Sequence, residues 1–252
     1  MFTGLVEELG AVRAVRRGAR SCVLDIGARV VLGDLAIGDS VAVNGVCLTA
    51  TSVGPTGFTA DVMPETLGRS SLASARPGTP VNLERAMAAG GHFGGHIVSG
   101  HIDGTGTVAH IERDDNAVWF SVRAPRRVLA LVVEKGSIAI DGTSLTVARV
   151  DDAAGTLSVS IIPHTFDATT LGRRHVGDAV NLEADLVGKY VARLLGVESL
   201  AGAPGASGPL AASGALGSLT APSASGPGGC ANSRDAPTSR LDLDLLARAG
   251  FA

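Results

Sequence analysis

The sequence NGVCLTA at 44–50 returns as DGTSLTV at 141–147, and this repeated stretch decides the fold. An alternating apolar run leads into each copy, SVAVNG at 40–45 and SIAIDG at 137–142. Such alternation predicts a strand, and Asn-Gly or Asp-Gly predicts a tight hairpin turn. Each copy therefore predicts two strands joined by a turn, with a polar cluster where the second strand begins.

Further matches keep nearly the same spacing. The offsets between matched segments are 96, 97 and 99, always in the same order along the chain, which indicates duplication of a unit of about 97 residues. Besides the hairpins, the matched pairs are TGLVEELGAV (3–12) with SGHIDGTGTV (99–108), MPETLGRSSL (63–72) with IPHTFDATTL (162–171), and PGTPVNLE (77–84) with VGDAVNLE (176–183).

Each unit has the pattern of an all-β domain. Short apolar runs alternate with Gly, Pro, Asn or Asp at intervals of roughly 8–12 residues. A small antiparallel barrel accounts for this pattern most economically, because closure removes exposed strand edges. ETLGRSSL and HTFDATTL each follow a proline and are candidates for a short helix between strands.

The pattern changes after residue 184. In DLVGKYVARLLGVESL the apolar residues have helical spacing, which predicts an amphipathic helix at 185–200. Residues 201–238 contain 29 Ala, Gly, Ser or Pro in 38 positions and are predicted to be a disordered linker. A short terminal helix is predicted at 239–252. The stripe of the first helix consists of Leu186, Val187, Tyr190, Val191, Leu194 and Leu195.

The composition bounds the class of protein. With 252 residues, 45% hydrophobic and 18% charged, the chain is long enough for two small domains with buried cores. A net charge of −3 and 3% aromatic residues argue against nucleic acid as a partner. Three cysteines without a C-x-x-C pair fit a reducing compartment. We expect no secretory signal and no membrane helix, and hence a cytoplasmic protein.

The segment GGHFGGHIVSGHI places three histidines close together. A zinc site would need His92, His96 and His101 on one face, yet the glycines forbid a stable helix and no nearby Cys or carboxylate completes a ligand set. We therefore predict no metal. We interpret His92 and His96 as part of a Gly-rich connection between barrels. In the repeat register His101 replaces Leu5, which suggests that one barrel has a role the other lacks.

Other polar residues differ between the repeats. Cys47 is the equivalent of Ser144, and the pair represents either small residues filling a barrel mouth or polar groups at a ligand pocket. Asp185 replaces Ala86 and is either a solvated carboxylate or a group at the barrel rim. Lys135 replaces Gly38, and a compact ammonium has a pKa that its surroundings shift readily.

Taken together, these motifs match a known family. In their order, MFTGLVE, NGVCLT, GGHIVSGHIDG, KGSIAIDGTSLT and IPHTFDATTLG resemble the riboflavin synthase α chain, over about 1–197. The resemblance implies an all-β fold with a C-terminal helix, in which two tandem six-stranded antiparallel Greek-key-type β-barrels arose by internal duplication. The implied domains are a lumazine-binding barrel at 1–97, a second at 98–184 and a trimerisation helix at 185–200.

The resemblance also implies the reaction. Two molecules of 6,7-dimethyl-8-ribityllumazine dismutate by transfer of a four-carbon unit, giving riboflavin and 5-amino-6-(D-ribitylamino)uracil, without a cofactor. It implies a homotrimer with sites between barrels of neighbouring subunits, and it allows association with lumazine synthase. The candidate catalytic residues are His101, Ser144, Thr146, Asp185 and Cys47, with His101 as a base that Thr146 orients.

The implied ligand contacts fall in two groups. In the first barrel they are Gly4, Leu5, Val6, Cys47, Leu48, Thr49, Asp61, Val62, Met63, Pro64, Glu65 and Thr66. In the second barrel they are Gly100, His101, Ile102, Lys135, Ser144, Leu145, Thr146, Ile161, Ile162, Pro163, His164, Thr165 and Phe166. One departure stands out, because His164 occupies a position where the family pattern has Glu.

Two other functions compete with this one. A non-catalytic carrier or antenna protein for lumazine or flavin would have the same duplicated barrels, but it would be expected to lose polar site residues from one of them. A structural β protein leaves the repeated polar hairpins unexplained. Because all five catalytic candidates are present, the sequence favours the enzyme.

Overall fold

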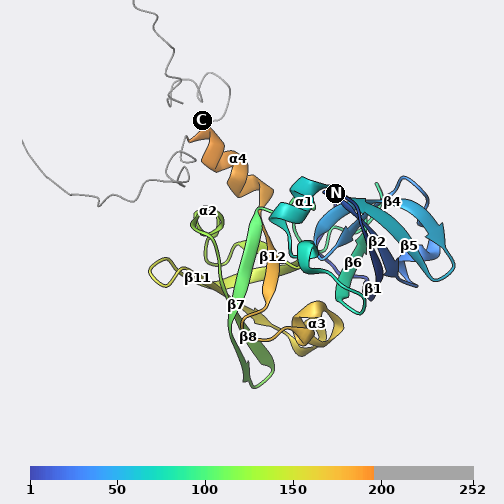
Figure 1. Ribbon diagram of the computed structural model, residues 1–252. Helices are drawn as coiled ribbons and strands as arrows, with labels where there is room; N and C mark the ends of the chain where they lie inside the picture. The colour runs from blue at the N-terminus through green and yellow to red at the C-terminus, as the bar shows by residue number, and fades with distance from the viewer. Residues whose placement is uncertain (196–252) are drawn as a thin grey trace, which may run out of the picture. The chain divides into compact units, whose positions relative to one another are not determined.

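The structure, a computed structural model, describes residues 1–195, and in this part of the chain twelve strands form two closed barrels (Figure 1). The linker predicted at 201–238 and the terminal helix predicted at 239–252 lie outside the described residues, as does the end of the helix predicted at 185–200. The first barrel comprises β1 (Glu8–Arg17), β2 (Cys22–Gly27), β3 (Ser40–Val43), β4 (Val46–Gly54), β5 (Gly57–Val62) and β6 (Pro80–Arg85). The second comprises β7 (Gly104–Asp114), β8 (Ala117–Arg123), β9 (Ser137–Ile140), β10 (Thr143–Asp151), β11 (Thr156–Ile161) and β12 (Ala179–Ala184).

The two barrels have the same topology. Their strand orders are β1-β2-β5-β4-β3-β6 and β7-β8-β11-β10-β9-β12, and every pairing is antiparallel. The register shifts also recur, at Ala50/Ser52 in β4 and at Val147/Arg149 in β10. Such bulges bend a strand and help it to curve around a barrel. The duplicated all-β fold predicted from the repeats is confirmed.

The hairpin turns in the repeated motif are also as predicted. The φ angles are +47° and +78° at Asn44 and Gly45, and +47° and +79° at Asp141 and Gly142. Two successive positive φ angles define the turn type that matches strand twist, and Asn-Gly and Asp-Gly tolerate it best. Short helices follow the prolines, as α1 (Pro64–Arg69) and α3 (Pro163–Ala168). The remaining short elements are η1 (Val31–Gly33), η2 (Ser71–Ser74), α2 (Arg126–Leu129) and η3 (Thr170–Arg173).

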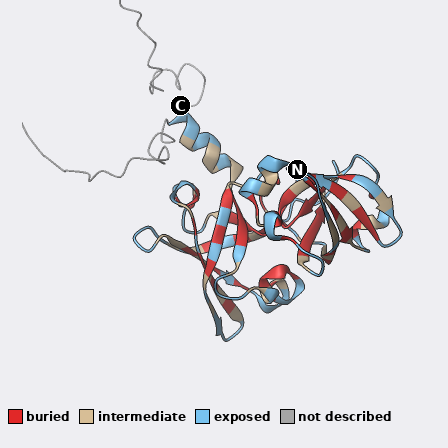
Figure 2. Cartoon of the chain, viewed as in Figure 1, coloured by how far each residue is buried: buried red, intermediate tan, exposed pale blue. Residues whose placement is uncertain are grey.

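Each barrel has its own apolar core. Along the strands buried residues alternate with half-buried or exposed ones, and Figure 2 shows this as red bands between tan or blue ones. The first core contains Leu24, Ile26 and Phe58, and the second contains Phe120 and Leu157, all at most 1% exposed. The period-two pattern therefore fixes which side chains fill the barrels.

The two hairpin turns meet at the seam between the barrels. A Cβ atom built on Gly45 would lie 2.7 Å from the nitrogen of Gly142, so the backbones touch. An asparagine from each barrel crosses this seam. The side chain of Asn82 in β6 donates to the carbonyl of Asp141 at 2.8 Å, and that of Asn181 in β12 donates to the carbonyl of Asn44 at 2.8 Å. These exchanged hydrogen bonds satisfy polar backbone that the seam buries.

Replacing Gly142 with alanine should destabilise the chain strongly. Its φ of +79° is strained for alanine, by about 1–2 kcal/mol. The new Cβ would also lie 2.6 Å from the nitrogen of Gly45, and forcing the turns apart adds about 1–3 kcal/mol. Gly155 is the matched control, since its φ is +69° but nothing lies within 4 Å of its Cβ position. Urea unfolding should show Gly155→Ala to be clearly milder, and equal effects would contradict close packing of the turns.

Helix α4 (Leu186–Leu194) follows directly after β12 and projects from the barrel (Figure 1). Its N-cap is Asp185, whose side chain accepts from the N–H of Val187 at 3.0 Å. Lys189 binds Asp103 at 2.7 Å and so fastens the helix to the second barrel. No residue of α4 is buried, and among the described residues no helix has the length and apolar character to span a membrane.

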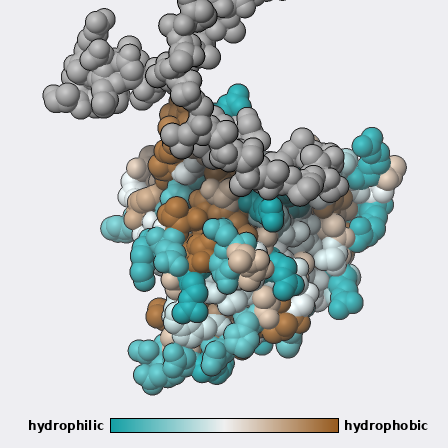
Figure 3. Space-filling view, turned by 90° about the vertical axis from the view of Figure 1, so that its left-hand side faces the viewer, coloured by the Kyte–Doolittle hydropathy of each residue, from teal (hydrophilic) through white to brown (hydrophobic). Residues whose placement is uncertain are grey.

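The predicted apolar stripe is largely exposed. Leu194 is 77% exposed, and Val187, Tyr190, Val191 and Leu195 are exposed as well. Figure 3 shows brown, hydrophobic atoms open on the face that it presents. Leu186 differs, because it is only half-buried and lines a cavity together with Lys189. The stripe is therefore narrower than the sequence predicts.

Candidate active site

Each repeated hairpin is completed by a segment from the other half of the chain. The N–H of Ser144 in β10 donates to the carbonyl of Gly4 at 2.8 Å, and the N–H of Cys47 in β4 donates to the carbonyl of Gly100 at 2.9 Å. We call residues 2–6 and 98–102 the crossover segments. Ile102 packs against the core of the first barrel, which supports the same arrangement. Two composite sites result, one at Cys47 and one at Ser144.

The resemblance groups the ligand contacts by barrel, whereas the crossover segments pair with the hairpin of the other barrel. Gly4 and its neighbours Leu5 and Val6 were expected beside Cys47, but the structure places Gly4 against Ser144. Gly100 was expected beside Ser144, but it lies against Cys47. The physical reason is that each crossover segment precedes the first strand of its own barrel and pairs across the seam before that strand begins.

A carboxylate holds each crossover segment in place. Glu84 at the end of β6 accepts from the N–H groups of Thr3 and Gly4 at 2.6 and 3.0 Å. Glu183 in β12 accepts from the N–H groups of Ser99 and Gly100 at 2.7 and 3.0 Å. Burial raises the pKa of Glu84, and the hydrogen bonds from Thr3 and Gly4 oppose this. Both glutamates belong to the repeated VNLE sequence, which matches between the halves but suggested no role by itself.

The crossover segments need glycine. Gly4 and Gly100 have φ angles of +77° and +81°. A Cβ on Gly4 would lie 2.6 Å from that of Ser144, and a Cβ on Gly100 would lie 2.5 Å from that of Cys47. Glycine thus permits the positive φ and the close approach to the hairpin.

Beyond Cys47 and Ser144, which pair with the crossover segments, the strand edge beside each hairpin is open. β4 pairs with β5 only from Ala50 onward, and β10 pairs with β11 only from Val147 onward. Strand alternation turns the N–H groups of Thr49 and Thr146 to the same side as those of Cys47 and Ser144. Among the described residues neither threonine has a ladder partner on that side. Each edge can therefore offer backbone donors and acceptors to a planar heterocycle.

Strand alternation also determines which of the predicted contact residues point toward the open edge and which point into the barrel core. Cys47 and Ser144 are half-buried, and Thr49 and Thr146 are exposed. Five predicted contacts instead point into the barrel cores, where only their backbones are available to a ligand. These buried residues are Leu48, Val62, Leu145, Ile161 and Phe166.

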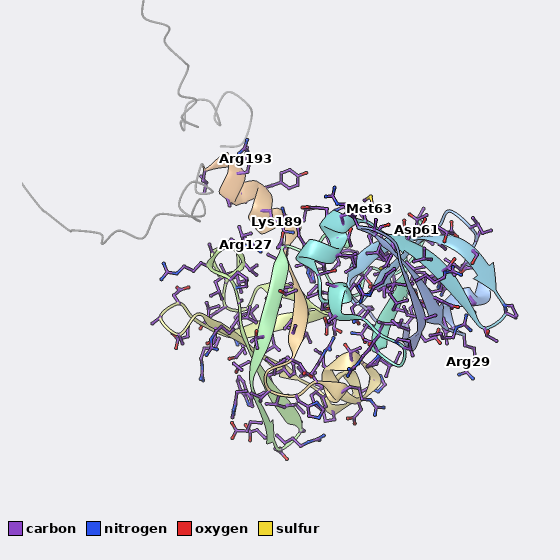
Figure 4. The ribbon with its side chains drawn as sticks, in the orientation of Figure 1. Arg29, Asp61, Met63, Arg127, Lys189 and Arg193 are labelled. Atoms are coloured by element: carbon purple, nitrogen blue, oxygen red, sulfur yellow. The ribbon has the colours of Figure 1, made fainter. Side chains whose placement is uncertain are left out.

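The loops after β5 and β11 carry further predicted contacts. Asp61 and Met63 are exposed at the end of β5 beside α1 (Figure 4). Ile162 holds the position equivalent to Met63 and is also exposed. His164, in place of the expected Glu, is exposed near the start of α3. The other predicted contacts in these loops, which are Pro64, Glu65, Thr66, Pro163 and Thr165, are exposed or half-buried.

His101 lies at a cavity of about 560 Å³ that is lined by residues of α1, α2 and α4 and by the second crossover segment. Its side chain is exposed, and Ser99, Asp103, Arg127 and Lys189 line the same space; Figure 4 shows Arg127 and Lys189. Leu5, its repeat equivalent, lines a cavity of about 700 Å³ beside the first barrel. Among the hydrogen bonds of the described residues, none joins His101 to Thr146, so the predicted orientation of the base is absent from a single chain. Within residues 1–195, no three His, Cys, Asp or Glu side chains gather as a metal site would require.

Lys135 and Asp185 lie near the site at Ser144. The N–H of Lys135 donates to the carbonyl of Val147 at 2.8 Å, next to Thr146, and its side chain is exposed. Its φ of +65° is unusual for lysine, whereas its repeat equivalent Gly38 has +98°. Asp185 caps α4, and its charge raises the pKa of His96, although burial lowers that pKa by more.

His96 was interpreted from the sequence as part of the connection between barrels, and the structure places it in the site. Its Nδ1 lies 2.7 Å from the hydroxyl oxygen of Ser144, and its side chain is buried. Comparing the two repeats could not identify His96 as a site residue, because the segment that contains it has no counterpart in the other repeat.

Comparison with known proteins agrees with this architecture. A family model described as lumazine binding domain matches residues 3–86 and 99–185. A riboflavin synthase of Actinobacillus pleuropneumoniae is 45% identical over 251 residues, with 100% of both chains covered. A riboflavin synthase of Mycobacterium tuberculosis (strain ATCC 25618 / H37Rv) is 51% identical over 199 residues, with 77% of this chain and 98% of that protein covered.

Solved structures give the same fold. Crystal structures of LumP complexed with 6,7-dimethyl-8-(1'-D-ribityl) lumazine and with riboflavin match with TM-scores of 0.66 and 0.67. Each alignment covers 73% of this chain and 99% of the LumP chain, and the sequence identities are 21% and 22%. Identities this low show the shared fold alone.

Proposed function

This chain belongs to the riboflavin synthase family of enzymes, and we propose that it converts two molecules of 6,7-dimethyl-8-ribityllumazine into riboflavin and 5-amino-6-(D-ribitylamino)uracil. The observation that carries the proposal is the pair of composite hairpin sites. Each combines an open strand edge, a threonine, and a small polar side chain against a glycine of the crossover segment. Two equivalent sites suit a reaction whose two substrates are identical.

The two sites offer different chemistry. The site at Cys47 is next to His101 along the crossover segment, whereas the site at Ser144 has His96 and lies near Asp185. A base is needed to remove a proton from the acidic C7 methyl group of one lumazine, and His101 is the candidate. A hydroxyl or thiol is needed to add to the other lumazine, and Ser144 and Cys47 are the candidates. Holding both rings in a fixed stack supplies much of the rate.

The catalytic unit is a homotrimer in this proposal. The exposed stripe of α4 needs a partner, and copies of itself are the simplest one. A trimer would bring the first barrel of one subunit to the second barrel of its neighbour and complete the pair of substrates. A cytoplasmic location and an association with lumazine synthase stay predictions.

Mixing the purified chain with 6,7-dimethyl-8-ribityllumazine tests the activity directly. Riboflavin absorbance should rise, with one riboflavin formed for every two lumazines consumed. A non-catalytic carrier would bind the lumazine, shift its fluorescence and form no riboflavin, and that result would overturn the proposal in favour of the carrier.

A further inference from the structure

Ser144 is enclosed on three sides. Its N–H donates to Gly4, its hydroxyl meets Nδ1 of His96 at 2.7 Å, and a Cβ on Gly95 would lie only 3.1 Å from its own Cβ. The same Cβ on Gly95 would lie 1.9 Å from the carbonyl oxygen of Thr3, so this close approach requires glycine. The segment 94–98 thus packs closely against the first crossover segment, and this packing places His96 next to Ser144.

Backbone hydrogen bonds fix the position of His96. Its N–H donates to the carbonyl of Thr3 at 3.1 Å, and two residues later Phe2 and Val98 exchange hydrogen bonds at 2.8 and 3.1 Å. The imidazole is therefore held by a short antiparallel pairing and not by a free loop. Among residues 1–195 no hydrogen bond joins a histidine to Cys47, and the connection between the barrels occurs only once in this part of the chain. The histidine makes the two otherwise equivalent hairpins chemically different.

The other ring nitrogen of His96 has no hydrogen-bond partner in the described part of the chain. The side chain is only 7% exposed, and within the described residues Nε2 makes no hydrogen bond. If the hydroxyl of Ser144 donates to Nδ1, the neutral ring carries its proton on Nε2, as a donor without an acceptor. A buried donor left unpaired is destabilising, and a bound ligand with an acceptor atom would relieve that cost.

We propose that His96 is a catalytic residue that acts with Ser144: it accepts the hydroxyl proton at Nδ1 and holds Nε2–H for an acceptor atom of the bound lumazine. In the step this supports, the Ser144 oxygen forms a bond to a ring carbon of the acceptor lumazine. The π electrons of the ring C=N bond move onto nitrogen, and the hydroxyl proton passes to His96. Expulsion of the serine reverses these changes and returns the proton. The inference rests on the proposed function.

The surroundings of His96 favour the neutral form of its imidazole, which can accept a proton. Burial lowers its pKa, so the ring is neutral and able to accept a proton at neutral pH. The charged group facing it from α4 is Asp185, which raises the pKa by less than burial lowers it. Glu84 lies behind the crossover segment, bound to the N–H groups of Thr3 and Gly4. Among the described residues, the effect of burial on the pKa of the ring therefore outweighs that of Asp185.

A double-mutant cycle tests the link between the two residues. His96→Asn keeps an acceptor near the position of Nδ1 but cannot take the proton, and turnover should fall by roughly 10²-fold. In a Ser144→Ala background the same change should cost almost nothing more, because His96 then has no hydroxyl to serve. If His96 only supports packing, the loss will be the same in both backgrounds, and the proposal fails.

The pH profile gives a second readout. Turnover of the wild type should fall on acidification as His96 takes up a proton. In His96→Asn this contribution to the acid limb should be lost, which leaves only the part due to the proposed base His101. The stability of the fold should depend on the same imidazole. Because the pKa of His96 is lower in the folded than in the unfolded chain, its contribution to the free energy of unfolding is fully present above about pH 6.5. That contribution is lost as the pH falls through the folded pKa. An unchanged acid limb in the variant would overturn the proposal.

Two further variants complete the experiment. His92→Asn changes an exposed histidine of the same connection and should leave the kinetics and the acid limb unaltered. His96→Gln places an amide nearer the position of Nε2, so it should keep riboflavin affinity while losing turnover. Wild-type protein that makes no riboflavin would contradict the proposed function itself. Active wild type with an additive cycle would contradict only the role of His96.

Discussion

Turnover should fall by roughly 10²–10⁴-fold when His101 is replaced with glutamine. The change keeps a polar side chain but removes a group able to take a proton from the lumazine methyl group. Riboflavin binding should weaken much less, because an open strand edge and apolar side chains supply most contacts with the ring. Single-turnover kinetics and fluorescence titration with riboflavin measure the two quantities separately.

His110 provides the control for this experiment. It is an exposed histidine on β7 of the same barrel, paired with Glu112 at 3.3 Å and away from both hairpins. His110→Gln should be fully active. Near-normal turnover in His101→Gln would remove His101 as the base and would move that role to Asp185 or to proton loss assisted by the substrate.

Leu194→Asp should separate the subunits and abolish most of the activity. Leu194 is 77% exposed at the end of α4, on the stripe that we expect to be buried between copies of the chain. A carboxylate buried there without a partner costs several kcal/mol. Sedimentation should then report monomers, and turnover should collapse because in the proposed trimer each pair of substrates lies between barrels of two chains.

A matched substitution separates the helix from a general effect of surface charge. Val176 is 62% exposed, and it lies before the other end of β12, away from α4. Val176→Asp should leave both the assembly and the activity intact. A Leu194→Asp monomer with full turnover would contradict the trimer and also the sharing of sites between subunits.

The internal repeat specifies most of the fold. The alternating runs around NGVCLTA and DGTSLTV specify strands, and the Asn-Gly and Asp-Gly pairs specify turns with two positive φ angles. Both are local properties, because side-chain alternation and backbone dihedral preferences depend on a few adjacent residues. The proline-led helices α1 and α3 follow for the same reason.

The repeat comparison predicts candidate site residues where the two halves differ. Cys47 and Ser144 were identified in this way, and each occupies a hairpin edge next to a crossover segment. The same comparison did not identify Glu84 and Glu183, because a residue that is identical in both halves shows no difference. These carboxylates nevertheless bind the backbone of the two crossover segments.

Only the tertiary structure decided which segments meet. Sequence continuity assigns Gly4 to the first barrel and Gly100 to the second, yet hydrogen bonds across the seam exchange them. It also brought His96 to Ser144, with 47 residues between them along the chain. Contacts of this kind depend on two folded barrels packing together, and no local preference encodes them. The sequence by itself therefore determined the barrels and their hairpins, and the packing of one barrel on the other decided the chemistry of the sites.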